Sequence, residues 1–209
     1  MRRGKLVHVV DDDDGVRKAV GFLLRTAGFA VRPWAAGGDL LRAVDASQPA
    51  CILLDLQMPP PDGLTVQREL IARGITIPVV IFTGRGDPGV AVQALRAGAH
   101  DVIEKPFERA HLLGVIDGVF RLMGDPGEAG RRAAAAKRAL STLQDGEYAV
   151  LRYLAEGLTN AQIADALDVP APAVELRRAS LLRKLDVPHL SAALRLFFAT
   201  GASAGDQYG

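Results

Sequence analysis

Short apolar runs, each closed by polar residues, recur along the N-terminal part of the chain. The clearest run is Cys51-Ile52-Leu53-Leu54, which ends abruptly at Asp55. Runs of this length suit β-strands that are buried on both faces, as in a parallel sheet flanked by helices. The pattern predicts strands at residues 6–10, 30–34, 51–55, 75–82 and 101–103.

Between these runs, apolar residues recur at the spacing of an amphipathic helix. Val16, Val20, Leu23 and Leu24 show this spacing, and Gly28 then ends the segment. Helices are predicted at residues 16–27, 37–47, 64–72, 90–97 and 108–123. The regular alternation of strand and helix predicts an α/β fold with a doubly wound, five-stranded parallel sheet and right-handed crossovers.

The pattern changes at residues 124–130, where Gly, Pro and acidic residues give the composition of a flexible linker. Beyond this point Thr159 to Gln162 fits a capping box, and two short helices around residues 168–170 make a helix-turn-helix candidate. Helices are predicted at the far end of 131–140 and at 145–156, 160–167, 172–184 and 190–198. We therefore expect a domain at 1–123, a partly helical linker at 124–140, a small all-α domain at 141–199 and a disordered tail at 200–209.

Composition narrows the class of protein. The 209 residues are 49% apolar and 23% charged, which is ordinary for a globular protein. No window holds the roughly 18 apolar residues of a membrane span, so we expect no membrane association. The single cysteine, Cys51, excludes a disulfide scaffold, and we expect a cytoplasmic location. Residues 1–130 carry 15 basic and 16 acidic side chains, whereas residues 131–209 carry 10 basic and 8 acidic ones. The small positive net charge of the C-terminal part weakly favours DNA binding.

Polar residues that could share one site stand at the carboxyl ends of the predicted strands. Asp11 and Asp12 follow the first strand, and Asp55 ends the third. Thr83 follows the fourth strand and Lys105 follows the fifth. Open α/β sheets place their chemistry at these ends because the loops there converge on a crevice. Carboxylates, a hydroxyl and an ammonium together predict a site for a divalent metal and a phosphoryl group.

A carboxylate that accepts a phosphoryl group forms a mixed anhydride, and the transfer depends mainly on charge neutralisation. Mg²⁺ suits this task because it takes one or two carboxylates together with phosphate oxygens. We expect Asp12 and Asp55 to bind Mg²⁺ directly, and Asp11 to bind it through a water molecule. The backbone carbonyl of Gln57 is a further predicted ligand. Lys105 would neutralise one phosphoryl oxygen, and the hydroxyl after the fourth strand would bind another.

Four short motifs carry a specific resemblance. They are Val-Asp-Asp-Asp at 10–13, Leu-Asp-Leu-Gln-Met-Pro at 54–59, Thr-Gly-Arg-Gly-Asp at 83–87 and Glu-Lys-Pro-Phe at 104–107. With these motifs, residues 5–122 resemble the receiver domain of two-component response regulators, most closely the FixJ-like group. The resemblance implies a flavodoxin-like fold, a sensor histidine kinase as partner and Asp55 as phosphoacceptor. It also implies that Asp11 and Asp12 form the acidic pocket, that Thr83 is the switch hydroxyl and that Lys105 is the lysine of the site.

One position departs from that family. Val102 stands three residues before Lys105, where the family usually has Tyr or Phe, so the aromatic switch coupled to Thr83 is missing. Gln57 lies two residues after the acceptor, and Arg85 lies two residues after the switch threonine. Both flank the path by which water would attack the phosphoryl group. We hypothesise that Gln57 and Arg85 set the lifetime of that group.

The C-terminal helices carry a second set of motifs, among them Ala155-Glu156-Gly157-Leu158-Thr159-Asn160 and Leu181-Leu182-Arg183-Lys184-Leu185. With them, residues 143–198 resemble the LuxR-type helix-turn-helix domain of FixJ-like and NarL-like regulators. The resemblance implies promoter DNA as a partner. The residues predicted to contact DNA are Val174, Arg177, Arg178, Arg183 and Lys184. Glu175 replaces a cation that is common in the family, which removes one phosphate contact and adds repulsion.

These features predict a two-component response regulator, a phosphoprotein that a histidine kinase phosphorylates on Asp55. Phosphorylation would promote a homodimer, which gives a helix-turn-helix its paired half-sites for regulating transcription. One alternative is a protein-binding signalling module with a degenerate DNA-binding domain, which Glu175 and Val102 favour. A less favoured alternative is an aspartyl-phosphate phosphatase, which generally needs an acidic residue where Gln57 stands. We therefore expect that the protein is not an enzyme.

Overall fold

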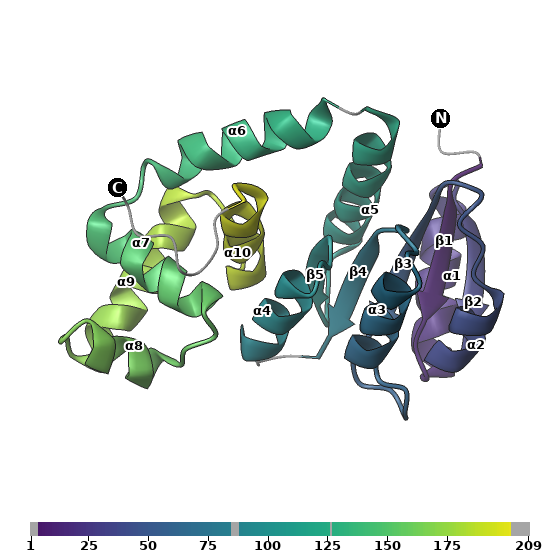
Figure 1. The fold of residues 1–209 in the computed structure, drawn as a ribbon, viewed down its shortest axis with the longest axis horizontal. Coiled ribbons are helices and arrows are strands. Elements are labelled where there is room, and N and C mark those ends of the chain that lie inside the picture. Colours follow the sequence, from purple (N-terminus) through teal and green to yellow (C-terminus); the bar gives the residue numbers. More distant parts are fainter. Residues whose placement is uncertain (1–3, 85–87, 126, 202–209) are drawn as a thin grey trace. The chain divides into compact units, whose positions relative to one another are not determined.

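The computed structural model describes residues 4–84, 88–125 and 127–201, and Figure 1 traces the chain. The described residues form two compact units, 4–84 with 97–125 and 88–96 with 127–201. The first unit contains the sheet, and the second is built from helices. Among the residues that the structure describes, no helix is both long enough and apolar enough to cross a membrane.

The sheet has five parallel strands in the order β2-β1-β3-β4-β5. Val7 of β1 pairs with Val31 on one side and with Cys51 on the other. The strands are β1 Leu6–Val10, β2 Ala30–Trp34, β3 Ala50–Asp55, β4 Val79–Thr83 and β5 Asp101–Glu104. This strand order is that of the flavodoxin-like fold. The predicted doubly wound five-stranded parallel sheet is confirmed.

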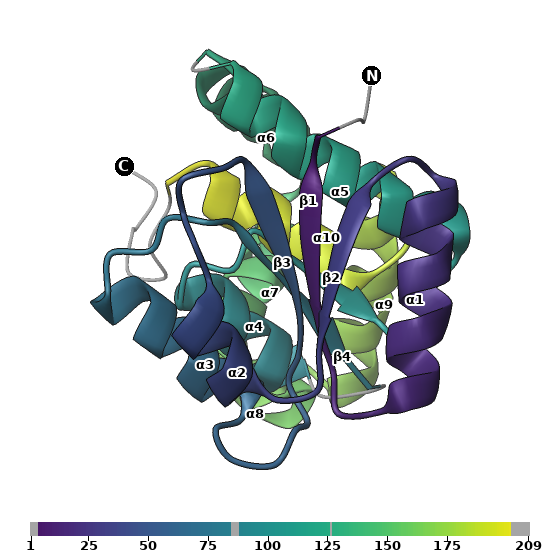
Figure 2. The same ribbon diagram turned by 90° about the vertical axis from the view of Figure 1, so that its right-hand side faces the viewer.

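Helices cover both faces of the sheet, and every residue of β1, β3 and β4 is buried. On one face, α1 (Asp14–Thr26) and α5 (Arg109–Gly124) share an apolar core with the sheet, in which Leu24, Leu53 and Ile116 are fully buried. Figure 2 shows α2 (Gly37–Ala43) and α3 (Gly63–Ala72) on the other face. This double layer fixes the strands so that their carboxyl ends meet at one edge.

The second helix is shorter than the apolar pattern predicts. We expected a helix at 37–47, but α2 ends at Ala43, and the backbone of Val44 is extended with ψ 129°. The carboxylate of Asp45 accepts hydrogen bonds from the backbone N–H and the hydroxyl of Ser47. Such a local turn competes with helical hydrogen bonding, which explains the early end of the helix.

The fourth strand also begins later than predicted. The apolar run predicted a strand at 75–82, whereas β4 starts at Val79, directly after Pro78. Proline has no N–H to donate to a neighbouring strand, so it stands at the strand entry. Its carbonyl accepts a hydrogen bond from the N–H of Ile52, 2.9 Å away.

The second unit consists of α4 and five C-terminal helices. Its elements are α4 Pro88–Arg96, α6 Glu128–Leu140, α7 Asp145–Ala155, α8 Asn160–Ala166, α9 Ala171–Lys184 and α10 Leu190–Ala199. The predicted capping box is confirmed, because the Thr159 hydroxyl accepts from the Gln162 N–H while the Gln162 side chain accepts from the Thr159 N–H. The short connection between α8 and α9 gives the helix-turn-helix arrangement that the sequence predicts.

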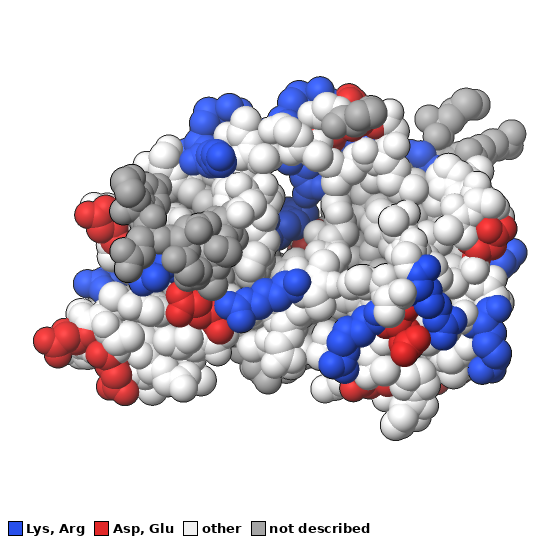
Figure 3. Space-filling view, in the orientation of Figure 1, with Lys and Arg blue, Asp and Glu red and all other residues white. Residues whose placement is uncertain are grey.

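Helix α6 begins within the glycine-rich segment, earlier than the predicted start of helical structure at residue 131. The alanine run between Arg132 and Lys137 is a strong helix former and extends the helix toward Glu128. Basic side chains gather along α6 on the face seen in Figure 3. At the other end of this unit, Thr200 caps α10, and residues 202–209 of the predicted disordered tail lie outside the described residues.

Gly63 should be needed for the loop that follows Asp55. A Cβ at Gly63 would lie 2.3 Å from the carbonyl oxygen of Asp55 and 2.8 Å from Cα of Leu56, both backbone atoms. We expect Gly63→Ala to lower the free energy of unfolding by about 2 kcal/mol, because the backbone must shift. In the control, Gly114→Ala at an exposed position of α5 meets no atom within 4 Å and should stabilise the protein by about 0.5–1 kcal/mol. Urea unfolding of both variants measures the contrast, and equal effects would contradict it.

Candidate functional site

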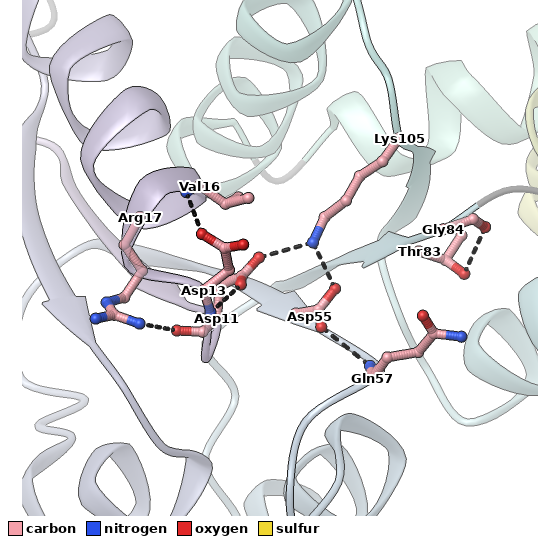
Figure 4. A network of polar contacts seen from close by, with 9 residues as sticks. All are labelled: Asp11, Asp13, Val16, Arg17, Asp55, Gln57, Thr83, Gly84 and Lys105. Atoms are coloured by element: carbon pink, nitrogen blue, oxygen red, sulfur yellow. Dashed lines mark hydrogen bonds and ion pairs between the residues drawn. The ribbon is translucent and has the colours of Figure 1, made fainter.

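An ion-paired cluster lies at the carboxyl edge of the sheet (Figure 4). Asp11 follows β1, Asp55 ends β3, and Lys105 follows β5. The Lys105 Nζ atom lies 2.7 Å from Asp11 Oδ2 and 2.7 Å from Asp55 Oδ1, and it donates to both. Both carboxylates are buried. The structure thus brings together three residues that the sequence places at the ends of separate strands.

The protonation of this cluster reflects burial and pairing acting in opposite directions. Burial raises the pKa of Asp55, the negative charge of Asp11 adds to the rise, and the hydrogen bond and charge of Lys105 only partly oppose it. Burial alone would lower the pKa of Lys105, but its hydrogen bonds to Asp11 and Asp55 and their charges raise it. Lys105 therefore stays a cation, whereas the ionised form of Asp55 is less stable in the folded protein than it would be in water.

The carboxylates fit a hard divalent cation. One oxygen atom from each of Asp11, Asp12 and Asp55 can be chosen so that all three lie within 4.8 Å of one another. Asp11 and Asp55 are buried, whereas Asp12 is exposed. An all-oxygen donor set that keeps one side open to water suits Mg²⁺, which retains part of its hydration shell. Three carboxylates and one ammonium also leave an excess of negative charge for a cation to neutralise.

Gln57 and Thr83 lie on the side of Asp55 that faces away from Asp11 (Figure 4). The N–H of Gln57 donates to Asp55 Oδ2 at 3.1 Å, and its side chain extends toward the side of Thr83 in Figure 4. The Thr83 hydroxyl donates to the carbonyl of Gly84 at 3.1 Å. Val102 is buried in β5. Arg85, predicted to influence phosphoryl lifetime, lies outside the described residues.

The helical unit contains a second ion pair, in which the carboxylate is buried and the lysine side chain is 34% exposed. Glu147 of α7 is 4% exposed and accepts hydrogen bonds from Lys184 Nζ at 2.8 Å and from the Ser180 hydroxyl at 2.7 Å. It also accepts from the N–H of Gln144 and so completes a capping box. Burial would raise the pKa of Glu147, but the hydrogen bonds from Lys184 and Ser180 outweigh it and lower the pKa. This pair fixes the end of α9 against α7.

The structure places the predicted DNA contacts in different surroundings. Val174 has no exposed surface and packs in the core of the unit, so its side chain is not available for the predicted contact with DNA. The guanidinium of Arg177 lies against Gly146 of α7, since a Cβ at Gly146 would be 3.2 Å from its Cζ atom. Arg178 donates to the Asn160 side chain at 2.9 Å and links α9 to α8.

The exposed face of α9 keeps one of the predicted residues and adds others. Arg183, predicted to contact DNA, is exposed there, together with Glu175 and Ala179. Leu176, which the sequence reasoning missed, is 71% exposed. A signal for it existed, because Val174, Leu181 and Leu185 form the buried stripe at helical spacing and Leu176 falls outside that stripe.

Comparisons with protein families agree with both halves of this geometry. Residues 7–117 match the family described as the response regulator receiver domain, and residues 141–197 match bacterial regulatory proteins of the luxR family. This chain belongs to the response regulator family. It is a response regulator with a LuxR-type domain, as the motifs predicted, and the family of two-component transcription regulators is confirmed.

Several relatives align with this response regulator along nearly its whole length. The chain is 36% identical to the transcriptional regulatory protein FixJ of Azorhizobium caulinodans, over 96% of this chain and 95% of FixJ. It is 37% identical to the C4-dicarboxylate transport transcriptional regulatory protein DctR of Rhodobacter capsulatus, over 91% and 98% of the two chains. Response regulator protein TodT of Pseudomonas putida is 32% identical over 93% of this chain and 86% of TodT.

Solved structures show the same relationship. Full-length FixJ from B. japonicum is 31% identical, with a TM-score of 0.57 over 95% of this chain and 98% of FixJ. The response regulator StyR is 33% identical, with a TM-score of 0.56 over 93% and 98% of the two chains. This response regulator is therefore similar to them along nearly its whole length.

Asp55→Asn should stabilise the receiver unit, in a way that depends on pH. A group whose folded-state pKa is raised contributes most to stability below its unfolded value, here 3.8, and loses that contribution as pH rises through the folded pKa. We expect the variant to be more stable than wild type at about pH 7, with a difference that shrinks toward about pH 4. Urea unfolding across this range in metal-free buffer measures the effect, and a difference independent of pH would contradict it.

Lys184→Met should destabilise the helical unit. The substitution leaves the buried Glu147 carboxylate without its cation, which costs about 1–3 kcal/mol of unfolding free energy. The control is Arg183→Met on the same helix, where the exposed side chain should change stability by less than about 0.5 kcal/mol. Thermal and urea unfolding compare the two variants. The role given to Lys184 is wrong if both variants are as stable as wild type.

Proposed function

We propose that Asp55 of this transcriptional response regulator accepts a phosphoryl group from a sensor histidine kinase in the presence of Mg²⁺. The observation that carries the proposal is the buried contact of Asp11 and Asp55 with Lys105, beside the exposed carboxylate of Asp12. Membership of the receiver family supports it. We further propose that residues 1–123 act as the phosphoacceptor domain and residues 141–199 as the DNA-binding domain.

In the proposed transfer, an Oδ atom of Asp55 forms a bond to phosphorus while the P–N bond of the kinase phosphohistidine breaks. The electron pair of that bond stays on the imidazole, which takes up a proton. Lys105 already donates to an Asp55 oxygen and would neutralise a phosphoryl oxygen at the same place. When bound by Asp11, Asp12, Asp55 and the Gln57 carbonyl, Mg²⁺ would supply the remaining charge neutralisation.

The phosphoryl group would then change the Thr83 loop. Thr83 now donates its hydroxyl to Gly84, and the new acceptor would compete for that hydrogen bond. Because Val102 is aliphatic and buried, no aromatic ring at that position can follow the threonine. The signal would pass through the loop after β4. Gln57, and Arg85 beyond the described residues, would set how long the phosphoryl group survives attack by water.

For DNA binding, we propose that the exposed face of α9 enters the major groove of promoter DNA. Arg183 would bind a phosphate, and the apolar Leu176 suits contact with a thymine methyl group. Arg178 would hold α8 and α9 at a fixed angle through Asn160. Phosphorylation would promote a homodimer, and the dimer would pair two half-sites. The protein is proposed to work in the cytoplasm.

The exposed Leu176 beside Glu175 also supports a second candidate function, a signalling module that docks a protein through α9. An acidic residue next to an exposed leucine is an unfavourable DNA surface and an acceptable protein surface. A phosphatase is less favoured, because the amide of Gln57 cannot exchange a proton as a carboxylate would. The relatives are also transcription regulators, so we propose that this chain is not an enzyme.

The two candidates are separated by one experiment with full-length protein. Treatment with a small phosphodonor and Mg²⁺ should add one phosphoryl mass to wild type and none to Asp55→Asn. The treated wild type should then dimerise by light scattering and retain a reproducible set of genomic fragments in DNA capture with sequencing. Phosphorylation at Asp55 without capture of any fragment at low salt would favour protein docking. Labelling of Asp55→Asn equal to that of wild type would overturn the acceptor assignment.

Arg183→Ala tests the α9 surface. Loss of one phosphate contact should weaken binding to every captured fragment alike and reduce the slope of log affinity against log salt by about one. Leu176→Ala is the matched variant, because it should change the choice of fragment and leave the salt slope unchanged. Fluorescence anisotropy at several salt concentrations measures both. A salt slope equal to that of wild type in Arg183→Ala would remove this residue from the contact surface.

A further inference from the structure

Arg17 reaches the acidic pocket from the first turns of α1. Its Nη1 atom donates to the backbone carbonyl of Asp11 at 2.7 Å, and its Nη2 atom donates to Asp14 Oδ1 at 3.1 Å. The Arg17 side chain is only 15% exposed, although it lies on a solvent-facing helix. Figure 4 shows the guanidinium beside the Asp11 main chain, on the side away from Lys105. Arg17 has no role in the proposed phosphoryl transfer.

The contact completes the immobilisation of Asp11. The Asp11 N–H donates to the carbonyl of Trp34 at 3.3 Å, and its carboxylate binds Lys105 and accepts from the N–H of Asp13. Without Arg17, no described hydrogen bond would restrain the backbone carbonyl of Asp11. The bond from Arg17 removes that freedom.

The immobilised carbonyl belongs to the peptide that joins Asp11 to Asp12. Asp12 is the exposed carboxylate of the three that can meet around a cation. Rotation of this peptide would move Cα of Asp12, and with it the carboxylate, away from Asp55. A hydrogen bond from a cation to this carbonyl is strong because the donor is charged.

We propose that Arg17 is a positioning residue for the metal site, which holds the Asp11–Asp12 peptide so that the Asp12 carboxylate is in place before the cation arrives. This inference rests on the proposed function of the pocket and adds a residue to it. Without Arg17, ordering one residue on binding would weaken cation affinity by roughly five- to thirtyfold.

The direction of this effect separates positioning from electrostatics. The guanidinium is itself positive, and it repels a divalent cation bound nearby. If Arg17 acted only through its charge, removing it would tighten cation binding. If it acts by holding the peptide, removing it weakens binding in spite of the lost repulsion.

Lys18 provides a matched control on the same helix. Its ammonium also pairs with Asp14, at 2.5 Å, but its side chain is 77% exposed. Among the described contacts, the Asp11 carbonyl accepts from Arg17 and not from Lys18. Lys18→Met therefore removes a neighbouring positive charge and a partner of Asp14 while it leaves the held peptide unchanged.

The test compares wild type, Arg17→Met, Arg17→Lys and Lys18→Met as full-length protein. Mn²⁺ is the probe, because it is a hard cation that accepts the same oxygen ligands as Mg²⁺ and its free form is counted by electron paramagnetic resonance. We expect Arg17→Met to bind Mn²⁺ about five- to thirtyfold more weakly than wild type. Arg17→Lys should fall between them, and Lys18→Met should match wild type. Binding by Arg17→Met that equals or exceeds wild type would overturn the proposal.

Amide hydrogen exchange in metal-free buffer gives a second measurement. The N–H groups of Asp11 and Asp13 should exchange faster in Arg17→Met, while those of α5 stay as protected as in wild type. Loss of protection throughout the receiver unit would show a folding defect, and the comparison then rests on Arg17→Lys. Failure of wild type itself to bind Mn²⁺ would contradict the proposed function of the pocket, whereas normal wild-type binding with an unaffected Arg17→Met contradicts only this inference.

Discussion

The contact of one ammonium with two buried carboxylates is the constraint on which the receiver unit depends. Lys105 Nζ lies 2.7 Å from both Asp11 and Asp55, at an edge where β1, β3 and β5 end. Two carboxylates this close would repel each other, and burial makes their charge more costly. The lysine relieves only part of that disadvantage, as the raised pKa of Asp55 shows. The unit therefore keeps negative charge ready for a cation and a phosphoryl group, in keeping with the proposed chemistry.

Supporting contacts hold this buried, ion-paired cluster in one geometry. Gly63 allows the chain after Asp55 to pass close to its own backbone, and Asp13 caps α1 by accepting from the N–H of Val16. Arg17 holds the main chain of Asp11 from the opposite side. Each contact restrains backbone rather than a catalytic side chain. A site that binds a small cation needs a restrained backbone, because any displacement of the backbone also displaces the carboxylates.

The helical unit uses the same principle for another purpose. Lys184 donates to the Glu147 carboxylate, and Arg178 donates to the Asn160 side chain. These two cations therefore hold the helices of the helix-turn-helix together. Their engagement leaves Arg183 as an exposed cation on α9, the helix that also exposes the apolar Leu176. The surface that remains has less positive charge than the sequence suggests. In the proposed DNA complex, such a surface would depend more on contacts with base edges than on attraction to phosphates.

The sequence alone determined the order of strands and helices, the family and the acidic and basic residues at the strand ends. These depend on local periodicity and on short motifs, and a parallel sheet necessarily brings its carboxyl ends together. Only the tertiary structure decided which cations are free. In the sequence, Arg17 shows no special pattern, and Arg178 and Lys184 are predicted to contact DNA. Their partners within the protein are known only once the side chains are packed. The packing of α9 against its neighbours likewise decides that Val174 lies in the core and Leu176 at the surface.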